Sequence, residues 1–466
     1  MPPPTAGTAQ TRAELTALRP DLVAAYDAAL PGARAAILQR LKKAIDREPL
    51  PAAANKTDTT DPVELVETRW PGSRLTTEID NSVANLALAR ANARPDARPD
   101  ARLDTMSEKS TLGEIEQSLV DGHPLHPCCR TRTGMTVADV LAYAPEHRTV
   151  IRLRRLRVPA DRWYGTGQPI LYAHPWQAGR LLAQYPWLQN AGVTRPVRPL
   201  MSLRTVAPIS GGPHIKTAVD IQMTSAVRTV SPAAVHNGPI LSTLLQRITA
   251  DLPIDILAET AAGAVITDDG PDRRAAHLIR EAPKLAPGET AVPLGILATW
   301  KRAGDPYPWV EKLGRVLFAP LARVLERGVA LEAHGQNTIL VLKNGEPERV
   351  LYRDLGGVRV HAGRLRAAGL DTPEIIGDLP TDDETELRTK LAAAALGTVA
   401  TQIIDGLDAD PALLWQTLAK AMRADPSADT EALLSEPLPV KATTAMRLAD
   451  DPLHDIWTHQ QNPMAA

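Results

Sequence analysis

The chain has 466 residues, 44% of them hydrophobic but only 3% aromatic, and its 52 Lys+Arg and 54 Asp+Glu give a formal net charge of -2. This length favours about three domains, and the absence of a basic excess argues against nucleic acid as a partner. No apolar run approaches a membrane span, the N-terminus lacks signal-peptide features, and the two cysteines are adjacent. We therefore expect a cytoplasmic protein with no membrane partner.

The N-terminal part reads as helical with two irregular segments. Residues 1–11 have the composition of a disordered leader. Leucines and alanines three or four positions apart predict helix over residues 12–45 and again over 79–93. An Ala-Arg-Pro-Asp repeat follows at residues 93–104, and its prolines exclude a regular helix, so we expect a solvated connector there.

A rigid, positively charged segment runs from Gly122 to Gly134. It contains two His and two Cys within seven residues, but their spacing is too short for the usual structural zinc site. Two alternatives stay open. Either the histidines are simply packed in a turn, or a stiff loop presents His126, Arg130 and Arg132 to an anion. The lack of an acidic residue within the segment favours the second alternative.

Two further features precede the central motif. The basic run within residues 149–173 has no interleaved aromatics, which is more typical of a solvated strand face than of a nucleic-acid surface. His174-Pro175-Trp176-Gln177 predicts the start of a short helix.

The stretch from Ser202 to Arg228 places Arg204, Lys216 and Arg228 twelve residues apart, with small hydroxyls beside them. These groups suit an anionic ligand such as a phosphate chain or a polycarboxylate. Residues 213–228 alternate, which predicts a strand with one buried face and one accessible face. A straight strand would separate the last two cations by about 40 Å. We therefore expect a bend near Thr224, with Thr224 and Arg228 on one face of a helical turn.

A third polar block closes a helix predicted from about Phe318. Gly335 is a natural helix stop, and an Asn344-Gly345 turn predicts a hairpin over residues 338–354. This hairpin would return Asp354 toward Gln336, next to His334, which makes a magnesium–nucleotide site plausible. His334 could equally be a structural histidine.

The C-terminal region is predicted to be largely helical and apolar over residues 381–422. Lys441 and Arg447 follow in a segment that could simply carry helix-surface charges.

No Walker A motif, dinucleotide glycine fingerprint or Gly-x-Ser-x-Gly elbow is present. The ordered set of blocks nevertheless resembles the siderophore synthetases that act independently of nonribosomal peptide synthetases (the NIS synthetases), typified by aerobactin synthetase. The resemblance rests on six blocks: Gly122–Pro127, Ser202–Thr205, His214–Lys216, Thr224–Arg228, Glu332–Asn337 and Arg353–Asp354. Arg130 departs from the pattern, since the family usually has Lys at that position.

The resemblance implies an α+β fold shaped like a cupped hand, with a mixed or antiparallel sheet in the fingers and a largely helical palm. We expect an N-terminal helical thumb over residues 1–110, with its leader and connector. Fingers that bind the nucleotide phosphates and the carboxylate would span residues 111–315. A palm whose hairpin completes the ATP site would span residues 316–466.

The resemblance also implies roles for individual residues. The residues expected to bind the nucleotide are His126, Ser202, Arg204, Thr205, Lys216, Gln336, Asn337 and Asp354. Magnesium would be held by Glu332 and Asp354. The carboxylate substrate and its chemistry would involve Thr224, Arg228, His334 and, on the weakest match, Lys441.

The implied activity is that of an acid–amine ligase with ATP and Mg²⁺ as cofactors. It would adenylate citrate or a related polycarboxylic acid, and an amine or alcohol would capture the acyl-adenylate, giving an amide or ester with AMP and pyrophosphate. Preorganised cations suit this chemistry, because they offset the repulsion between carboxylate and triphosphate. The small substrates would be its partners, and a homodimer with a second copy of the chain is a candidate assembly. A kinase-like phosphotransferase and a non-catalytic nucleotide-binding protein remain as alternatives.

Overall fold

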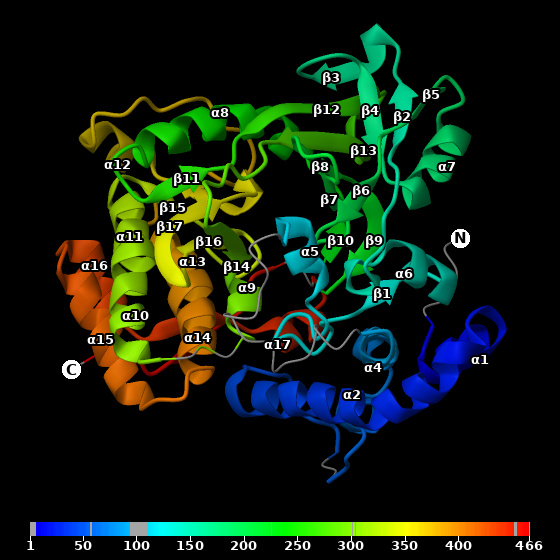
Figure 1. The fold of residues 1–466 in the computed structure, drawn as a ribbon, viewed down its shortest axis with the longest axis horizontal. Coiled ribbons are helices and arrows are strands. Elements are labelled where there is room, and N and C mark those ends of the chain that lie inside the picture. The colour runs from blue at the N-terminus through cyan, green and yellow to red at the C-terminus, as the bar shows by residue number, and fades with distance from the viewer. Residues whose placement is uncertain are drawn as a thin grey trace.

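The structure is a computed structural model that describes residues 6–55, 58–93, 110–224, 226–300, 302, 304–451 and 454–465. Helical layers lie below and to the left of a set of twisted sheets in Figure 1, and the N-terminal helices form the lower edge. The α+β fold class predicted from the sequence is confirmed. Residues 1–5 and most of the Ala-Arg-Pro-Asp repeat, whose first residue is Ala93, lie outside the described residues.

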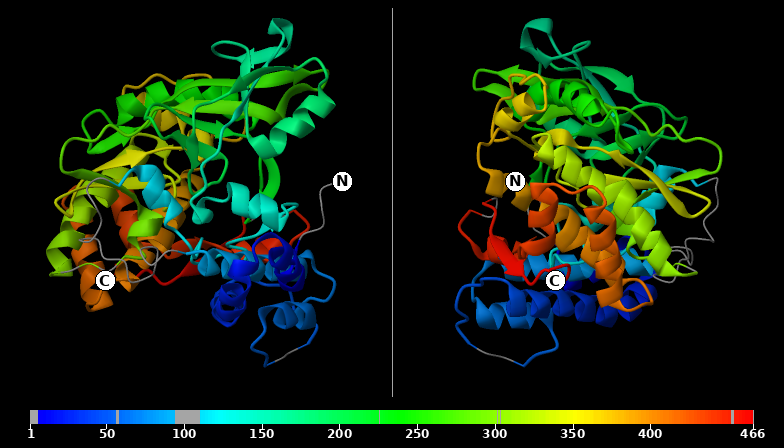
Figure 2. Two further views of the ribbon diagram at one scale, coloured as in Figure 1. Left: turned by 45° about the vertical axis from the view of Figure 1, so that its right-hand side comes forward. Right: turned by 90° about the vertical axis from the view of Figure 1, so that its left-hand side faces the viewer.

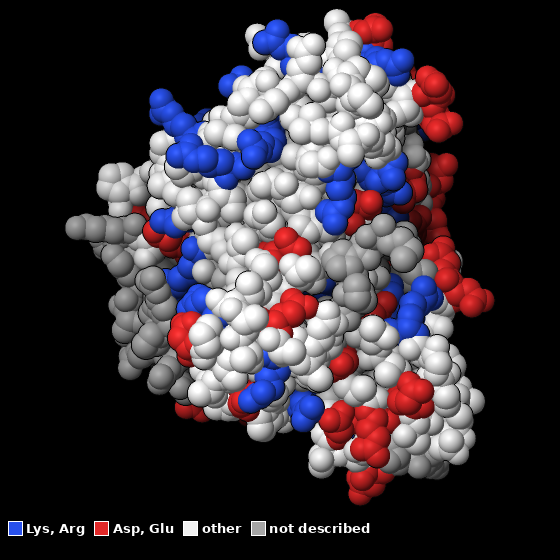
Figure 3. Space-filling view, turned by 90° about the vertical axis from the view of Figure 1, so that its right-hand side faces the viewer, with Lys and Arg blue, Asp and Glu red and all other residues white. Residues whose placement is uncertain are grey.

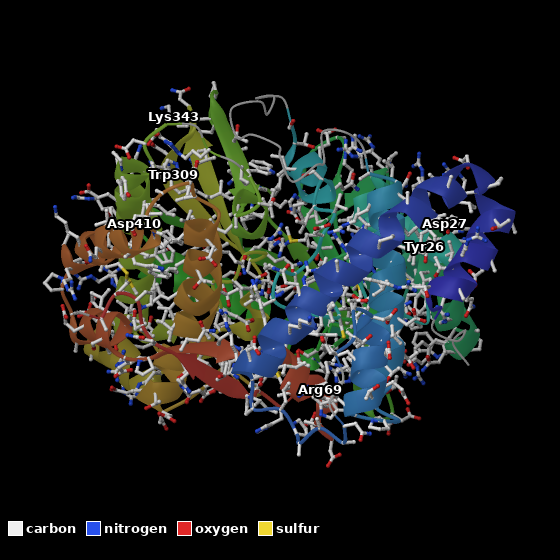
Figure 4. The ribbon with its side chains drawn as sticks, turned by 90° about the horizontal axis from the view of Figure 1, so that it is seen from below. Tyr26, Asp27, Arg69, Trp309, Lys343 and Asp410 are labelled. Atoms are coloured by element: carbon white, nitrogen blue, oxygen red, sulfur yellow. The ribbon has the colours of Figure 1, made fainter. Side chains whose placement is uncertain are left out.

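The N-terminal layer consists of helices packed on a buried central helix. Helix α4 is buried along most of its length, because α2 covers one side and residues 128–135 and strand β9 complete the same apolar core. Figures 2 and 4 show α2 running across this layer, with Tyr26 on it and fully buried. The first helix begins at Thr8, so the predicted eleven-residue leader is too long. The elements are α1 (Thr8–Leu18), α2 (Pro20–Arg47), α3 (Pro62–Arg69) and α4 (Arg74–Ala91).

The central region is built on an antiparallel six-stranded sheet with the order β3-β12-β13-β8-β7-β6. Helix α8 covers one face of it, as Figure 1 shows, and two three-stranded sheets, β4-β2-β5 and β1-β9-β10, lie beside it. The strands are β1 (Arg132–Thr133), β2 (Arg154–Arg157), β3 (Trp163–Gly165), β4 (Ile170–Ala173), β5 (Gln189–Val193), β6 (Val197–Pro199), β7 (Thr205–Pro208), β8 (His214–Thr217), β9 (Val219–Met223), β10 (Ala226–Arg228), β12 (Glu259–Thr267) and β13 (Gly270–Arg280). The helices of this region are α5 (Leu112–Gln117), α6 (Val137–Tyr143), α7 (Pro175–Gln184) and α8 (Pro232–Ile248), with short 3₁₀ helices η3 (Pro145–His147) and η4 (Ala160–Arg162).

The single alternating strand expected over residues 213–228 is wrong. Three short strands, β8, β9 and β10, replace it, and all of β8 is buried because β7 and β13 pair with both of its edges. His214 and Lys216 are therefore inside the protein rather than on an accessible face. Val227, expected in the core, is half exposed.

The remaining part combines a mixed four-stranded sheet, β11-β17-β16-β14, with a large helical core. The predicted hairpin is confirmed: β16 and β17 are joined at Asn344-Gly345, and Trp309 Nε1 donates to the Gly345 carbonyl (3.2 Å). Figure 4 labels Trp309 and Lys343 close together at this hairpin. The strands are β11 (Ile254–Ile256), β14 (Glu289–Pro293), β15 (Val329–Ala330), β16 (Thr338–Lys343), β17 (Glu346–Tyr352) and β18 (Arg359–Val360).

Two helices of this core contain π-helical segments, η5 (Gly314–Phe318) and η7 (Ala392–Ala400). The predicted helix over 381–422 is thus present but interrupted. The helix predicted to run from Phe318 toward Asn337 ends at Glu326, because Gly328 adopts φ 99° and starts a new direction. The helices are α9 (Leu294–Leu297), α10 (Pro306–Leu313), α11 (Ala319–Glu326), η6 (Leu355–Gly357), α12 (Ala362–Ala367), α13 (Glu384–Leu391), α14 (Thr401–Asp405), α15 (Pro411–Arg423) and α16 (Ala428–Ser435).

The C-terminal segment connects the helical core to the N-terminal layer. Strands β19 (Leu438–Lys441) and β20 (Trp457–Gln460) form a hairpin beside η7, and α17 (Thr443–Leu448) packs under α4. A buried ion pair between Arg447 and Glu78 fixes α17 there. Glu48 accepts the backbone N–H groups of Thr444 and Ala445 at 2.8 Å each.

The surface shown in Figure 3 carries patches of both charges rather than one continuous basic surface. Among the described helices, none combines the length and the apolar character that crossing a bilayer requires.

Candidate active site

A cavity of about 380 Å³ lies between the central region and the C-terminal part of the chain, and its lining comes from residues 119–132, 201–228 and 295–457. Its size is that of a small-molecule site. The predicted site residues that line it are His126, Ser202, Thr224, Arg228, Glu332, His334, Gln336 and Lys441. Segments more than 300 positions apart in the sequence thus converge at one place.

The other predicted site residues do not line this cavity. They are Arg204, Thr205, Lys216, Asn337 and Asp354. Lys216 Nζ lies 2.5 Å from Asp354 Oδ1, so strand β8 and the end of the hairpin are joined by an ion pair. The predicted set therefore divides into a cavity group and a more buried cationic group.

The Ser202–Thr205 block is a tight turn held by its own hydrogen bonds. Leu203 adopts φ 64°, and Ser202 Oγ accepts the Thr205 N–H at 3.2 Å. The backbone N–H and the hydroxyl of Thr217 both donate to the Arg204 carbonyl at 2.9 Å. The Arg204 main chain is thereby fixed, and its guanidinium donates to the Thr229 carbonyl.

The predicted bend near Thr224 is confirmed, but the helical turn is wrong. Thr224 adopts φ 55° between β9 and β10, which pair as a hairpin. Arg228 Nη2 reaches across it to Thr224 Oγ1 (2.5 Å) and to the Met223 carbonyl (3.0 Å). The two side chains are therefore adjacent because of hairpin pairing rather than helical periodicity.

His334 lies in a loop, not at the end of a helix. Its Nδ1 accepts the Gln336 N–H at 3.2 Å, so the neutral imidazole carries its proton on Nε2. Burial lowers the pKa of His334, although Glu332 and Asp354 oppose this. In this tautomer His334 is a hydrogen-bond donor and not a general base. The loop is held against α9 by the Gly295 N–H, which donates to the Gly335 carbonyl at 2.9 Å.

Glu332 faces the cavity and is paired with Lys390 Nζ at 2.9 Å. Burial favours its neutral form, but Lys390, His334 and Lys441 outweigh burial and lower the pKa of Glu332. The Glu332 side chain can take this position only because residue 357 is a glycine. A Cβ on Gly357 would lie 2.1 Å from Glu332 Oε2.

Ion pairs within the protein neutralise most of the positive charge in the segment after Gly122. This contradicts the hypothesis that Arg130 and Arg132 are presented to an anionic ligand. Both guanidinium groups contact the buried carboxylate of Glu146, at 3.1 and 3.0 Å. The sequence segment contains no acid, but α6 and η3 fold Glu146 back onto it. His126 does line the cavity, and its Nδ1 accepts the Cys128 N–H at 3.0 Å.

In this region the guanidinium groups of Arg204, Arg228 and Arg280 are largely buried, and none of them forms an ion pair with a carboxylate of the described residues. Burial lowers the pKa of all three, to about 10 for Arg228 and Arg280. The buried Nε atoms of Arg204 and Arg280 also find no acceptor in the described part of the chain. Buried, unpaired positive charge is unfavourable unless an anion compensates it, so this region suits a polyanion.

Asp354 has the charge that a metal ligand requires. Burial would raise its pKa, but Lys216, Arg204 and Arg280 outweigh burial and keep the pKa well below its usual value. Within the described ranges, no three His, Cys, Asp or Glu side chains form a preformed metal cluster. One or two carboxylates nevertheless suffice for Mg²⁺ when phosphates supply other oxygens, so Asp354 and Glu332 fit a nucleotide-bound Mg²⁺.

Several cavity or cluster residues were missed from the sequence. Lys390 carried a usable signal, because it lies three positions after Leu387 on the buried face of a predicted helix. Lys441, which was predicted, ends strand β19 rather than lying on a helix, and it pairs with Asp455 at 2.8 Å. Arg280, Gln402 and Thr443 sit in segments with no recognisable motif.

Comparison with known families supports the block assignment. Residues 111–173 and 165–299 match the IucA / IucC family model. Residues 308–452 match a model described as "Ferric iron reductase FhuF-like transporter". Both cysteines of the chain precede that second region, which therefore has no thiolate for an iron–sulfur cluster.

Two relatives illustrate the sequence similarity. Staphyloferrin A synthase of Staphylococcus aureus is 28% identical over 322 residues, which cover 56% of this chain and 55% of the relative. A citryl-spermidine/3,4-dihydroxybenzoyl-citryl-spermidine:spermidine ligase of Bacillus anthracis is 26% identical over 308 residues, 52% and 50% of the two chains. The matched segment thus spans about half the length of these relatives.

Solved structures extend the likeness to nearly the whole fold. The petrobactin biosynthesis protein AsbB of Bacillus anthracis superposes with a TM-score of 0.78 at 16% identity, covering 94% of this chain and 96% of AsbB. ATP-bound aerobactin synthetase IucA of Klebsiella pneumoniae gives 0.70 at 20% identity, covering 84% and 82%. Residues 111–299 match the IucA / IucC family, and the chain as a whole has the fold of these synthetases.

Proposed function

We propose that the protein is an ATP-dependent acid–amine ligase that adenylates citrate or a related polycarboxylic acid and transfers the acyl group to an amine, in siderophore or related natural-product biosynthesis. The observation that carries the proposal is the set of unpaired guanidinium groups of Arg204, Arg228 and Arg280 next to a cavity lined by His334. Named relatives that act on citryl compounds, and an ATP-bound neighbour, support the substrate class and the nucleotide.

In this proposal the buried cationic group binds the phosphates and the cavity group binds the carboxylic acid. Arg204 and Lys216, with Ser202 and Thr205, would hold the phosphate oxygens, and His126, Gln336 and Asn337 would complete the nucleotide site. Arg228 would bind the carboxylate and reduce its repulsion from the α-phosphate. His334 Nε2–H and the Thr224 hydroxyl would orient it. Mg²⁺ held by Asp354 and Glu332 would supply neutralisation of the pyrophosphate charge.

Lys216 has a second task in this arrangement. Its ammonium is bonded to Asp354, and burial lowers the pKa of Lys216 while Asp354 raises it. With nucleotide bound, Asp354 would be a ligand of Mg²⁺ and Lys216 Nζ would bind a phosphate oxygen. The ion pair thereby keeps both groups charged and positioned before the nucleotide arrives.

Product identity tests the proposal. Purified protein would be incubated with ATP, Mg²⁺ and a panel of carboxylic acids that includes citrate, with hydroxylamine as the nucleophile. AMP and pyrophosphate formed only with an acid, together with hydroxamate, are expected. ADP formation would instead indicate a phosphotransferase, and nucleotide binding without turnover would indicate a non-catalytic binder.

Three further expectations remain predictions: the division at residues 110 and 315, the homodimer and the cytoplasmic location. Light scattering on the purified full chain tests the homodimer directly, because a monomeric mass would refute it.

A further inference from the structure

One side of the cavity is not used by the proposed adenylation. It is formed by the π-helical segment η7 with the start of α14 and by the C-terminal hairpin, and we call it the palm wall. Its residues are Ala393, Ala394, Thr398, Gln402, Val440, Lys441, Thr443 and Trp457. In Figure 1, α13 and α14 lie to the left of centre, whereas β9 and β10, which carry Thr224 and Arg228, lie to the right.

The palm wall is tightly built. The helix approaches β19 so closely that a Cβ on Gly397 would lie 2.4 Å from the Pro439 carbonyl oxygen. Thr398 Oγ1 donates to the Ala393 carbonyl at 2.8 Å, which satisfies a carbonyl in the widened turn. Segments of π-helix often occur at functional sites because they displace side chains from the regular helical register. The wall therefore presents its side chains in fixed positions.

Two polar atoms on this wall lack partners. Gln402 Nε2 and Thr443 Oγ1 are buried, and neither atom forms a hydrogen bond with a group in the described part of the chain. The Thr443 residue as a whole is only 8% exposed. A buried polar group left unpaired costs about 1–3 kcal/mol, so two of them on one cavity wall point to a ligand that supplies the missing partners.

The charge of the cavity limits what this ligand can be. Five cationic side chains line it: Arg130, Arg132, Arg228, Lys390 and Lys441. Arg130 and Arg132 are paired with Glu146, Lys390 with Glu332 and Lys441 with Asp455, so among the five it is Arg228 that has no ion pair within the described residues. Among the described lining residues the one carboxylate is that of Glu332, which Lys390 already holds. No acidic group is thus left for a second ammonium. Gln402 Nε2 is a hydrogen-bond donor and the Thr443 hydroxyl can donate as well, so both suit carboxylate oxygens. Lys441, which is paired with Asp455, lies on the same wall.

We propose that the palm wall binds the nucleophile, and that this nucleophile is an amine bearing a carboxylate rather than a polyamine. The inference rests on the proposed function. The amine nitrogen forms a bond to the acyl carbon, the acyl C–O bond to the phosphate breaks, its electron pair leaves with AMP, and the amine proton passes to water. Gln402 and Thr443 position the carboxylate end while the amine faces the acyl group held by Arg228.

Three probes of equal length test the class of nucleophile: 3-aminopropanoate, 3-aminopropanol and 1,3-diaminopropane. They differ only in a distal carboxylate, hydroxyl or ammonium. We expect kcat/KM to fall in that order, by about tenfold or more from first to last, because 1.4 kcal/mol of lost interaction gives a factor of ten. A diamine used as well as 3-aminopropanoate would overturn the assignment.

Two variants test the wall itself, Gln402→Leu and Thr443→Val. Each is expected to raise KM for 3-aminopropanoate about fivefold to tenfold. Citrate-dependent ATP–pyrophosphate exchange, which needs no amine, is expected to stay at the wild-type rate. The matched control is Thr444→Val, because Thr444 is the next residue, is also buried and does not line the cavity.

Unchanged KM in both variants, or equal effects of Thr443→Val and Thr444→Val, would overturn the inference while leaving adenylation intact. An absence of acid-dependent exchange in the wild-type protein would refute the proposed function, and this inference with it. The two failures are therefore distinguishable in one set of measurements.

Discussion

Replacing Arg228 with Met is expected to separate activity from stability. The side chain keeps its approximate length but loses its charge. Among the described residues the guanidinium hydrogen-bonds to the Met223 carbonyl and to Thr224 Oγ1 and forms no ion pair, although Asp354 and Glu332 attract it from a longer distance. The charge of Arg228 is therefore available to bind a substrate, but it lowers the stability of the ligand-free protein.

Removing the Arg228 charge is expected to lower activity strongly while leaving the free energy of unfolding almost unchanged. A hydrogen bond from a charged group is worth about 1.5–3 kcal/mol, and a charge pair about 4 Å apart near a protein surface about 4 kcal/mol. Losing such a contact predicts a fall in kcat/KM of about 10²- to 10³-fold. For stability, lowering the pKa of Arg228 to about 10 corresponds to about 3 kcal/mol against the charged form. Two lost hydrogen bonds offset about 2 kcal/mol of that gain. The free energy of unfolding should therefore stay within about 1 kcal/mol of wild type, or rise.

Arg132→Met is the matched control, because Arg132 lines the same cavity but is paired with a carboxylate. Glu146 lies 3.0 Å away and its side chain is fully buried. Breaking a buried pair typically costs about 3–5 kcal/mol, and we expect the lower value because Arg130 remains beside Glu146. Calorimetric unfolding and citrate-dependent pyrophosphate exchange measure both quantities. Equal destabilisation by the two substitutions, or wild-type exchange in Arg228→Met, refutes the reasoning.

Three further substitutions test neighbouring features. His334→Gln keeps an N–H near the position of Nε2, so the rate of pyrophosphate exchange should stay within about tenfold of wild type. His334→Leu has no such donor, and its exchange rate should fall about 10²-fold. Equal losses of exchange rate in the two variants would indicate that His334 acts as a base. Gly357→Ala should push Glu332 aside and lower both stability, by about 1–3 kcal/mol, and the rate of exchange. Gly356→Ala is the control, because its Cβ would make only an ordinary contact with Asp354 Oδ1 at 4.0 Å. Burial raises the pKa of Glu48 to about 7, so its protonated form stabilises the fold below about pH 4.5 and this contribution is lost as pH rises through about 7. Glu48→Gln should therefore weaken the fall in Tm between about pH 5 and pH 8, and an unchanged pH profile would contradict this.

Much of the site could be predicted because its residues lie in compact blocks with recognisable turns. The Asn344-Gly345 turn fixes the hairpin, which is why Arg353 returns to the Glu332–Asn337 loop and donates from its N–H to the Asn337 carbonyl at 3.0 Å. The bend at Thr224 followed from strand length alone. These features depend on residues that are close together in the sequence, so they can be predicted from it.

Other features depend on residues that are distant in the sequence. The neutralisation of Arg130 and Arg132 by Glu146 was unpredictable because it depends on how α6 and η3 fold back. Alternation predicted an accessible face for Lys216, but neighbours on both edges bury β8. Arg280 contributes to the cationic group only because β13 pairs with β8, and such pairing is a property of the sheet rather than of either strand.

The geometry of the site is set by backbone strain as well as by pairing. Of the five described non-glycine residues with positive φ, three are Leu203, Thr224 and Asp354, each within a predicted site block. Such residues cost about 1–3 kcal/mol each and persist only where surrounding structure fixes them. Here hydrogen bonds to Ser202 and Met223 and the Lys216 ion pair do so. Because Arg204 and Arg228 are positioned by backbone carbonyls rather than by carboxylates, an arriving polyanion has no ion pair to break at either residue. The polyanion therefore gains the attraction of both charges. The same two unpaired charges destabilise the protein when no ligand is bound, so ligand binding removes that cost.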